Sequence, residues 1–382
     1  MSVGTYSLLS SADDFFAYVG GATYEDALWL YFTGTSGTNT VQVNDDSLVL
    51  VDEDNGTTTI DITSSSYDTL TELVAGINAV AGWDAGLVGH SSETSSNLRI
   101  TGALNAEGKA NTIYLEIKQT YLVEKLIDRA TDIIERYCNR LFKTRTYTNE
   151  TYWGTGYKKL ILDQYPVTRV ARIGEGRTNS FSIKNTSTDA NYSTVEITTS
   201  TIRLIVDGGT NADDTELTLS DYTSIDDLIT AIEALGKGWS CTTIATDTSY
   251  RDADELLPRP SMYVDSTKQA YCETPDELIT DYKWLRPTSQ DRNEGMLHRD
   301  GGWSEGTEYF VTYTAGFTTI PEALQMACLE LVNYKHNNRQ SGNLKSEWLG
   351  DYRYERFGIS DLKLGLPADI KSELDMFKKR VI

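Results

Sequence analysis

The chain repeats part of its own sequence, and this repeat is the strongest constraint on its fold. Two stretches align: SLVLVDEDNG followed by TIDITSSSYDTLTELVAGINAVAGW, and TIRLIVDGGT followed by TELTLSDYTSIDDLITAIEALGKGW. Each has the alternating apolar residues of strands, then a helix pattern opened by Thr69 or Ser224, then a tryptophan, Trp83 or Trp239. Chance similarity rarely preserves strand pattern, helix cap and flanking aromatic residue together. We therefore predict a small α/β module that occurs twice.

The alignment also predicts which residues of the two modules are equivalent. The helix positions Leu70, Leu73, Val74 and Ile77 pair with Ile225, Leu228, Ile229 and Ile232. Glu72 lies three residues after Thr69, the spacing of a capping box, and the second module has an acidic residue at the same position. Before the helix, Asp52 aligns with Asp207, and Asn55-Gly56 predicts a hairpin turn.

The acidity of the chain belongs mainly to these modules. Residues 31–118 hold 12 acidic and 3 basic residues, and residues 182–256 hold 14 acidic and 4 basic residues. The two stretches therefore carry -19 of the total net charge of -22. This balance argues against nucleic-acid binding through a basic surface, because such a surface needs lysine and arginine to neutralise phosphates.

Residues 121–142 form a long amphipathic helix pattern between the modules. The predicted apolar stripe is Leu122, Leu126, Ala130, Ile133, Tyr137 and Leu141, widened by Val123, Ile127, Ile134 and Cys138. Charged residues fill the opposite face. We expect the stripe to pack against a second helix at 321–336, and the charged face to remain free for a neighbouring subunit.

These patterns predict an α+β protein: a helical scaffold with a small β element, plus two inserted, β-rich α/β modules related by internal duplication. Residues 143–180 read as strands, and Thr23 to Leu28 as a further helical turn. The predicted divisions are 1–30 (scaffold N-terminal helix), 31–118 (module 1), 119–181 (main helix and strands), 182–256 (module 2), 257–342 (strands and helix) and 343–382 (C-terminal arm and helix).

No catalytic, metal or cofactor pattern is evident in the sequence. The four cysteines are far apart, and the three histidines lie in no ligand motif such as HExxH. Phosphate-binding glycine motifs are also missing. Acidic turns at Asp45-Asp46, Asp52-Glu53-Asp54 and Asp213-Asp214 leave calcium binding open as an alternative to solvated turns. We expect no cofactor, no catalytic residue and no metal, and no run of 18 apolar residues predicts a membrane span.

Outside the modules, several short motifs follow one another in a recognisable order. These are Ile134-Glu135-Arg136-Tyr137-Cys138-Asn139-Arg140, Tyr165-Pro166-Val167, Tyr313-Thr314-Ala315-Gly316, and Ser346-Glu347 with Gly350-Asp351-Tyr352. This ordered set resembles the head–tail connector, or adaptor, proteins of long-tailed bacteriophages. The resemblance covers about 220 of the 382 residues, and the two acidic modules depart from the family pattern.

The resemblance implies a structural virion protein at the neck, assembled in the host cytoplasm. It implies a ring of twelve copies around the DNA exit channel, in contact with the portal protein on one side and with a tail or neck protein on the other. Genomic DNA would pass through without specific binding, and no membrane would be involved. The implied portal-contacting residues are Trp348, Tyr352, Tyr354, Phe357, Met376, Phe377, Lys378, Lys379 and Arg380.

The contact between ring subunits is a separate expectation, drawn from the charged face of the long helix. The residues assigned to it are Asp132, Glu135, Arg136 and Arg140. Two other functions remain open at this point. The modules could decorate the virion and bind a host glycan, a fibre or a neighbouring neck protein. The chain could also be a polysaccharide hydrolase with paired carboxylates, although nothing in the sequence favours this.

Overall fold

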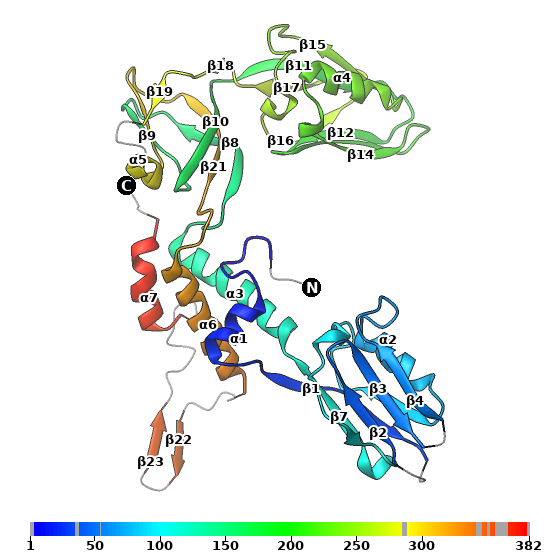
Figure 1. Cartoon of the computed structure of the whole chain (residues 1–382). Helices are drawn as coiled ribbons and strands as arrows, with labels where there is room; N and C mark the ends of the chain where they lie inside the picture. Colours follow the sequence, from blue (N-terminus) through cyan, green and yellow to red (C-terminus); the bar gives the residue numbers. More distant parts are fainter. Residues whose placement is uncertain are drawn as a thin grey trace. The chain divides into compact units, whose positions relative to one another are not determined.

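The computed structural model describes residues 4–34, 38–53, 55–284, 289–340, 346–349, 352–355 and 366–379. It consists of two compact units, one formed by 1–140 with 320–382 and the other by 141–319 (Figure 1). The first unit combines a helical bundle with module 1, and the second combines a β domain with module 2. The predicted α+β class is confirmed.

The helical bundle contains the long helix that the sequence predicted. Its helices are α1 Ala12–Val19, α3 Thr120–Cys138, α6 Glu322–Gln340 and α7 Ala368–Leu374. Helices α3 and α6 pack against each other, as expected, and α1 packs against both. Ser11 opens α1 with a capping box in which the Ser11 amide donates to the Asp14 carboxylate at 3.2 Å. Gly20 ends α1 in the left-handed conformation, with φ of 82°.

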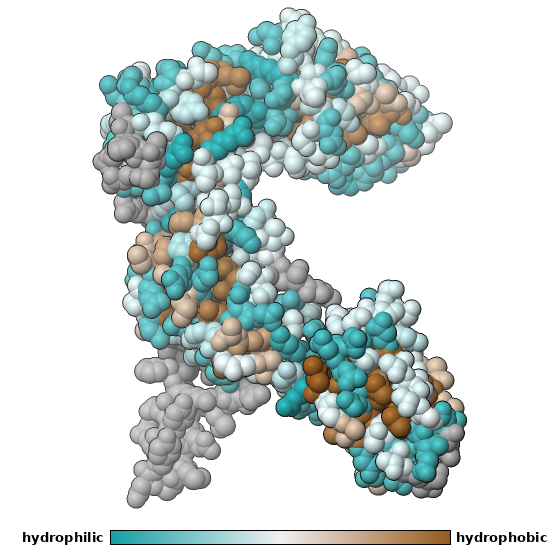
Figure 2. All heavy atoms as spheres, in the orientation of Figure 1, coloured by the Kyte–Doolittle hydropathy of each residue, from teal (hydrophilic) through white to brown (hydrophobic). Residues whose placement is uncertain are grey.

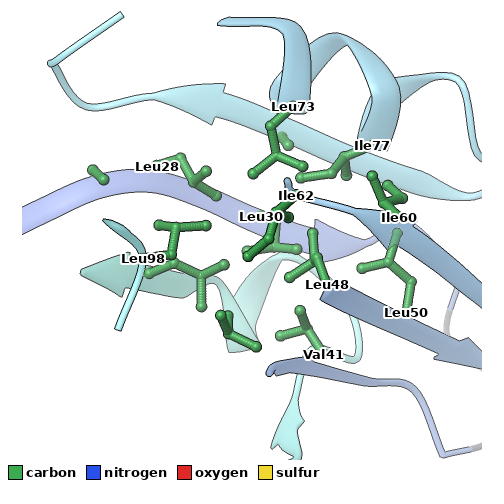
Figure 3. Close-up of a cluster of buried hydrophobic side chains, with 14 of the residues drawn as sticks. Leu28, Leu30, Val41, Leu48, Leu50, Ile60, Ile62, Leu73, Ile77 and Leu98 are labelled. Carbon is green, nitrogen blue, oxygen red and sulfur yellow. The ribbon is translucent and has the colours of Figure 1, made fainter. Parts of the chain in front are cut away.

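Module 1 consists of two antiparallel sheets and one helix around a shared core. Its elements are β1 Tyr24–Phe32, β2 Thr40–Val43, β3 Ser47–Asp52, β4 Gly56–Asp61, α2 Leu70–Asn78, β5 Trp83–Leu87, β6 Leu104–Asn105 and β7 Ile113–Lys118. One sheet has the order β5-β1-β7 and the other β4-β3-β2-β6. Leucine and isoleucine side chains from both sheets and from α2 meet in the core (Figure 3). Thr69 and Glu72 form the predicted capping box.

Module 2 has the same topology as module 1. Its elements are β11 Thr178–Asn185, β12 Tyr192–Ile197, β13 Thr201–Asp207, β14 Asp213–Thr218, α4 Ile225–Ala234, β15 Trp239–Thr243, β16 Arg259–Val264 and β17 Ala270–Thr274. The sheet orders, β15-β11-β17 and β14-β13-β12-β16, match those of module 1 strand for strand. Even a β-bulge recurs at the same place, between Asp26 and Leu28 in β1 and between Asn179 and Phe181 in β11. The predicted duplication is confirmed.

The structure corrects one residue pair of the sequence alignment. Leu48, Leu50 and Asp52 point into the core from β3, while Ile202, Leu204 and Val206 do so from β13. Asp52 is therefore equivalent to Val206, not to Asp207. A shift of one residue places a strand side chain on the opposite face, so only burial reveals the true register. The predicted hairpin at Asn55-Gly56 is present, since Asp52 pairs with Gly56.

The strands also place the module limits differently from the sequence prediction. Module 1 starts at Tyr24, because Tyr24–Phe32 is its central strand and not the predicted helical turn. Module 2 extends from 178 to 274, because β16 and β17 pair with its strands. The wrong start of module 1 and the wrong limits of module 2 have the same cause. The edge and outer strands of a two-sheet core are short and weakly patterned, whereas the helix and the central hairpin have clear signals.

The β domain of the second unit accounts for the strands predicted around 143–180. Its elements are β8 Arg145–Trp153, β9 Lys159–Ile161, β10 Val167–Glu175, β18 Glu277–Leu278, β19 Tyr282–Lys283, α5 Ser289–Glu294, β20 Met296–Arg299 and β21 Glu308–Ala315. They form sheets of order β18-β10-β21-β8 and β19-β20-β9. A buried polar network stabilises the first sheet: the Tyr313 hydroxyl donates to Glu150 at 2.5 Å and lies 3.1 Å from the Tyr152 hydroxyl. Burial raises the pKa of both tyrosines, so they stay protonated donors.

The sheet of β18, β10, β21 and β8 requires a glycine at position 316, directly after β21. The φ of Gly316 is 112°, and a Cβ atom there would lie 2.7 Å from the backbone carbonyl of Lys143. Both the strained backbone and the clash oppose a side chain. We expect Gly316→Ala to lower the free energy of unfolding of this unit by about 1–3 kcal/mol. Urea unfolding followed by tryptophan fluorescence measures the effect.

The matched control is Gly301→Ala, where an added Cβ would meet nothing within 4 Å. It should change stability by no more than about 0.5 kcal/mol. Equal unfolding midpoints for the two variants would show that the positive φ and the close approach do not constrain this sheet.

Candidate interaction surfaces

The buried side of α3 is shifted from the predicted stripe. Its buried residues are Val123, Glu124, Ile127, Ala130, Thr131, Ile134 and Cys138. The row expected at the centre, Leu122, Leu126, Ile133 and Tyr137, is only half-buried. Helices α1 and α6 cover the neighbouring side of the helix, and the Leu8 amide donates to the Thr131 hydroxyl at 3.1 Å. A half-covered apolar row is therefore left beside the charged face.

The charged face of α3 contains three of the residues assigned to a subunit contact. The Arg136 guanidinium donates to the Asp132 carboxylate at 2.9 Å, and their side chains are 70% and 54% exposed. Glu135 is half-buried on the adjoining turn. An exposed i,i+4 pair of this kind contributes only about 0.3–0.5 kcal/mol to the helix. Asp132 and Arg136 are therefore exposed to solvent on this face, and the role of the three residues in a ring stays a prediction.

Arg140 does not belong to this exposed face. The residue is 7% exposed, and its guanidinium donates to the Phe377 carbonyl oxygen at 3.4 Å. Helix α3 ends at Cys138, and Asn139 turns the chain through a left-handed conformation with φ of 50°. Arg140 lies beyond this turn, so the helical spacing that placed it with Arg136 no longer applies. Its position favours a role in folding.

The C-terminal turn packs on the end of α3. The Tyr137 hydroxyl donates to Asp375 at 2.7 Å, and the Lys379 amide donates to the Cys138 carbonyl at 2.8 Å. The Lys378 ammonium lies 2.7 Å from Asp375 and 4.1 Å from the centroid of the Tyr137 ring. Hydrogen bonds from Lys378 and Tyr137 lower the pKa of Asp375, which therefore stays charged. No local sequence pattern predicts this cluster, because Tyr137 and Asp375 are 238 residues apart.

The residues implied to contact a portal are distributed over this C-terminal region. Trp348 lies in β22 Ser346–Leu349, and Tyr352 and Tyr354 lie in β23 Tyr352–Glu355. The two strands pair as an antiparallel hairpin. In the turn after α7, Met376 is 77% exposed, whereas Lys378 makes the contacts within the subunit given above. Phe357 and Arg380 lie outside the described residues.

The outer face of the β5-β1-β7 sheet is a surface that the sequence analysis missed. Trp29 and Tyr31 have ring centroids 5.9 Å apart and planes inclined by 17°. Tyr114, which pairs with Trp29 across β7, is 56% exposed. The Tyr31 hydroxyl donates to Asp84 at 2.7 Å. Reading YEDALWLYF as a strand would have placed Trp29 and Tyr31 on one face, because their spacing is two.

No cluster of three or more histidine, cysteine, aspartate or glutamate residues suited to a metal is present among the described residues. Burial raises the pKa of Cys138, Cys241 and Cys328 to about 12, which leaves these thiols unreactive. In the acidic turns, Asp214 pairs with Arg203 at 2.6 Å and Asp52 accepts from the Asn55 amide.

Both modules present a largely polar surface, in keeping with their acidity; hydrophilic residues cover much of their visible face in Figure 2. No helix within the described residues is long and apolar enough to cross a membrane.

Similarity to known proteins is found among solved structures alone. No family model matches the chain, and neither does a curated protein. Among solved structures, the chain is similar to a chain in the neck of an empty GTA (gene transfer agent) particle computed with C6 symmetry. The identity is 10%, the TM-score is 0.24, and the alignment covers 69% of this chain and 80% of that chain. A similarity of this size establishes neither fold nor function.

Proposed function

We propose that the protein is a head-to-tail adaptor in the neck of a phage-like particle. In this role it is a structural protein, not an enzyme. It forms a ring, of twelve copies by resemblance to its proposed family, that joins the portal vertex to the tail or the next neck protein around the DNA exit channel. The observation that carries the proposal is the ordered set of connector-like motifs, which lie outside both modules.

The folded chain supports this interpretation of the motifs. Two of the motifs contact each other: Tyr165-Pro166-Val167 and Tyr313-Thr314-Ala315-Gly316. Their first residues are 148 positions apart in the sequence. Val167 nevertheless pairs with Ala315 in the neighbouring strand, and the Gly316 amide donates to the Pro166 carbonyl at 2.9 Å. Two motifs that contact each other have a structural reason to occur together. The motif that runs from Ile134 to Arg140 includes the end of α3, and the C-terminal turn packs on this end.

The charge distribution fits passage of DNA through such a ring. Most of the net charge of -22 comes from the modules, and the scaffold is close to neutral. A channel surface that is close to neutral would neutralise few phosphates, so DNA would pass through it without being bound tightly. The half-buried row of α3 and its charged face supply a mixed apolar and polar surface, as is common where subunits meet.

Charge reversal at two arginines tests the ring. Arg136→Glu should leave the melting temperature of the monomer nearly unchanged, because Arg136 is 70% exposed, but it should weaken ring formation. Arg140→Glu should lower the melting temperature, because the buried side chain would lose its carbonyl partner and place an unpaired carboxylate in the core. Mass photometry of the purified chain, alone and with portal protein, measures assembly, and differential scanning fluorimetry measures folding.

If the Arg136→Glu variant still forms a ring-sized complex, the charged face of α3 does not take part in the contact between subunits. A wild-type chain that stays monomeric even with portal protein would count against the adaptor function itself.

A second possible function is that module 1 binds a glycan through the outer face of the β5-β1-β7 sheet. The observation in its favour is the pair of stacked rings of Trp29 and Tyr31 on that face. Module 2 provides an internal comparison, because strand pairing makes Ser182 equivalent to Trp29 and Lys184 equivalent to Tyr31. The same fold therefore forms without these two rings. Aromatic faces of this type can pack against the C–H face of a sugar, and Asp84 offers an acceptor for a sugar hydroxyl.

The internal comparison supplies the test. A double variant, Trp29→Ser with Tyr31→Lys, gives module 1 the residues of module 2 and should preserve the fold. If module 1 recognises a glycan, wild-type protein should bind host-surface polysaccharide on a glycan array, and the double variant should bind at least tenfold more weakly. The control, Lys184→Ala in module 2, should bind like wild type. Equal binding by all three proteins, or by none, would refute this function.

A further inference from the structure

The rings of Trp29 and Tyr31 extend from β1 across the neighbouring strand β5. In this sheet Trp29 pairs with Gly86, and Tyr31 pairs with Asp84. A Cβ atom on Gly86 would lie 2.5 Å from atom Cζ2 of the Trp29 indole, so the indole occupies the space that a side chain at this position would fill. The Tyr31 hydroxyl donates to the Asp84 carboxylate at 2.7 Å. Each ring is therefore positioned by the residue opposite it on β5.

The arrangement of the two rings suits a ligand made of repeated cyclic units. Their planes are inclined by only 17°, and their centroids are 5.9 Å apart. Because alternate residues of a strand point to the same face, the two rings follow each other along β1. On the adjoining strand β7, Tyr114 is 56% exposed, so this face of the sheet is open to solvent there. Two rings in a row can each contact one unit of the same extended ligand.

Module 2 differs from module 1 at both members of each cross-strand pair. The equivalent pairs in module 2 are Ser182 with Thr242 and Lys184 with Ser240. A large residue opposite glycine in module 1 thus corresponds to a small residue opposite a larger one in module 2. A tyrosine opposite its hydrogen-bond acceptor corresponds to a lysine opposite a serine. The shared fold therefore requires neither ring, and each ring occurs together with the partner that positions it.

The charge of module 1 decides which class of glycan suits this face. Residues 31–118 hold 12 acidic and 3 basic residues. Two of these basic residues, Arg99 and Lys118, are already in ion pairs with carboxylates. The Asp84 carboxylate lies within hydrogen-bonding distance of the Tyr31 hydroxyl, and so at the edge of the rings. A polysaccharide with acidic groups would be repelled by this negative field, whereas an uncharged polysaccharide would not.

We propose that Trp29 and Tyr31 bind two consecutive sugar residues of a polysaccharide that carries no acidic groups. Each ring packs against the C–H face of one sugar residue, and Asp84 accepts a hydrogen bond from a sugar hydroxyl. Gly86 is a positioning residue, because a side chain at this position would displace the indole. The proposal rests on the second function given above, glycan recognition by module 1. It adds the class of glycan and the number of sugar residues that are recognised.

The test measures binding of the full chain to immobilised oligosaccharides by biolayer interferometry. The neutral probes are glucose, mannose, galactose and N-acetylglucosamine oligomers of one to four residues, and the acidic probes are oligomers of galacturonic acid. At least one neutral series should bind. In that series the disaccharide should bind at least about tenfold more tightly than the monosaccharide, because it covers both rings, and longer chains should add little. The galacturonic acid oligomers should not bind.

Two paired variants remove one ring each and introduce a strand pair that the same fold already contains. Trp29→Ser with Gly86→Thr, and Tyr31→Lys with Asp84→Ser, give module 1 the residue pairs of module 2. Each paired variant should abolish the advantage of the disaccharide over the monosaccharide, and its circular dichroism spectrum should match that of wild type. Gly86→Ala keeps the indole but displaces it, so this single variant should reduce the same advantage.

The matched control is Tyr271→Ala in module 2, because Tyr271 is 41% exposed and pairs with Ser182 as Tyr114 pairs with Trp29. It should bind like wild type. Equal binding of monosaccharide and disaccharide, tighter binding of the galacturonic acid oligomers, or paired variants that bind like wild type would overturn the inference and leave glycan recognition by module 1 in place. Absence of binding to every oligosaccharide would overturn both the inference and that function.

Discussion

The architecture depends on one constraint: each inserted module leaves the scaffold and returns to it at adjacent points. For module 1 this point is Gln119, which is buried before the first turn of α3. Its amide donates to the Thr23 carbonyl at 2.9 Å, and its side-chain oxygen accepts from the Thr23 hydroxyl at 3.1 Å and lies 2.9 Å from the His336 ring. The entry and exit of the module, α3 and α6 are thus joined in one polar contact. For module 2, the first and last strands pair directly, Thr178 with Thr274.

An insertion whose ends lie together adds a domain without stretching its host. This explains how the scaffold keeps a continuous bundle and a continuous sheet while each module forms a hydrophobic cluster of its own. Core residues of the two modules follow the shared topology, whereas equivalent positions on the other side of the β1 and β11 strands differ. Module 1 has Trp29 and Tyr31 there, and module 2 has Ser182, which is buried, and Lys184.

The sequence predicted the elements that have strong local signals. The duplication, both capped module helices, the hairpin at Asn55-Gly56 and the packing of α3 on α6 were all predictable, because periodicity and capping are local properties. The errors concern long-range geometry. The sequence pattern predicts a helical turn at Thr23 to Leu28 and a scaffold up to residue 30, because the pairing of strand β1 with β5 and β7 is distant in sequence. Arg140 was assigned to an exposed face because helical spacing was extended past the turn at Asn139. The pairing of Trp29 with Gly86 and of Tyr31 with Asp84 joins two strands that no sequence pattern connects.

The central claim is that this chain forms a ring at the portal vertex. Cryo-electron microscopy of the particle neck tests it most directly, with particles that contain the wild-type chain compared with particles that lack module 1. We predict a ring directly below the portal in which each subunit shows density for both modules, and the density of module 1 should disappear when module 1 is deleted. A neck without this chain, or a chain located at another site of the particle, would contradict it.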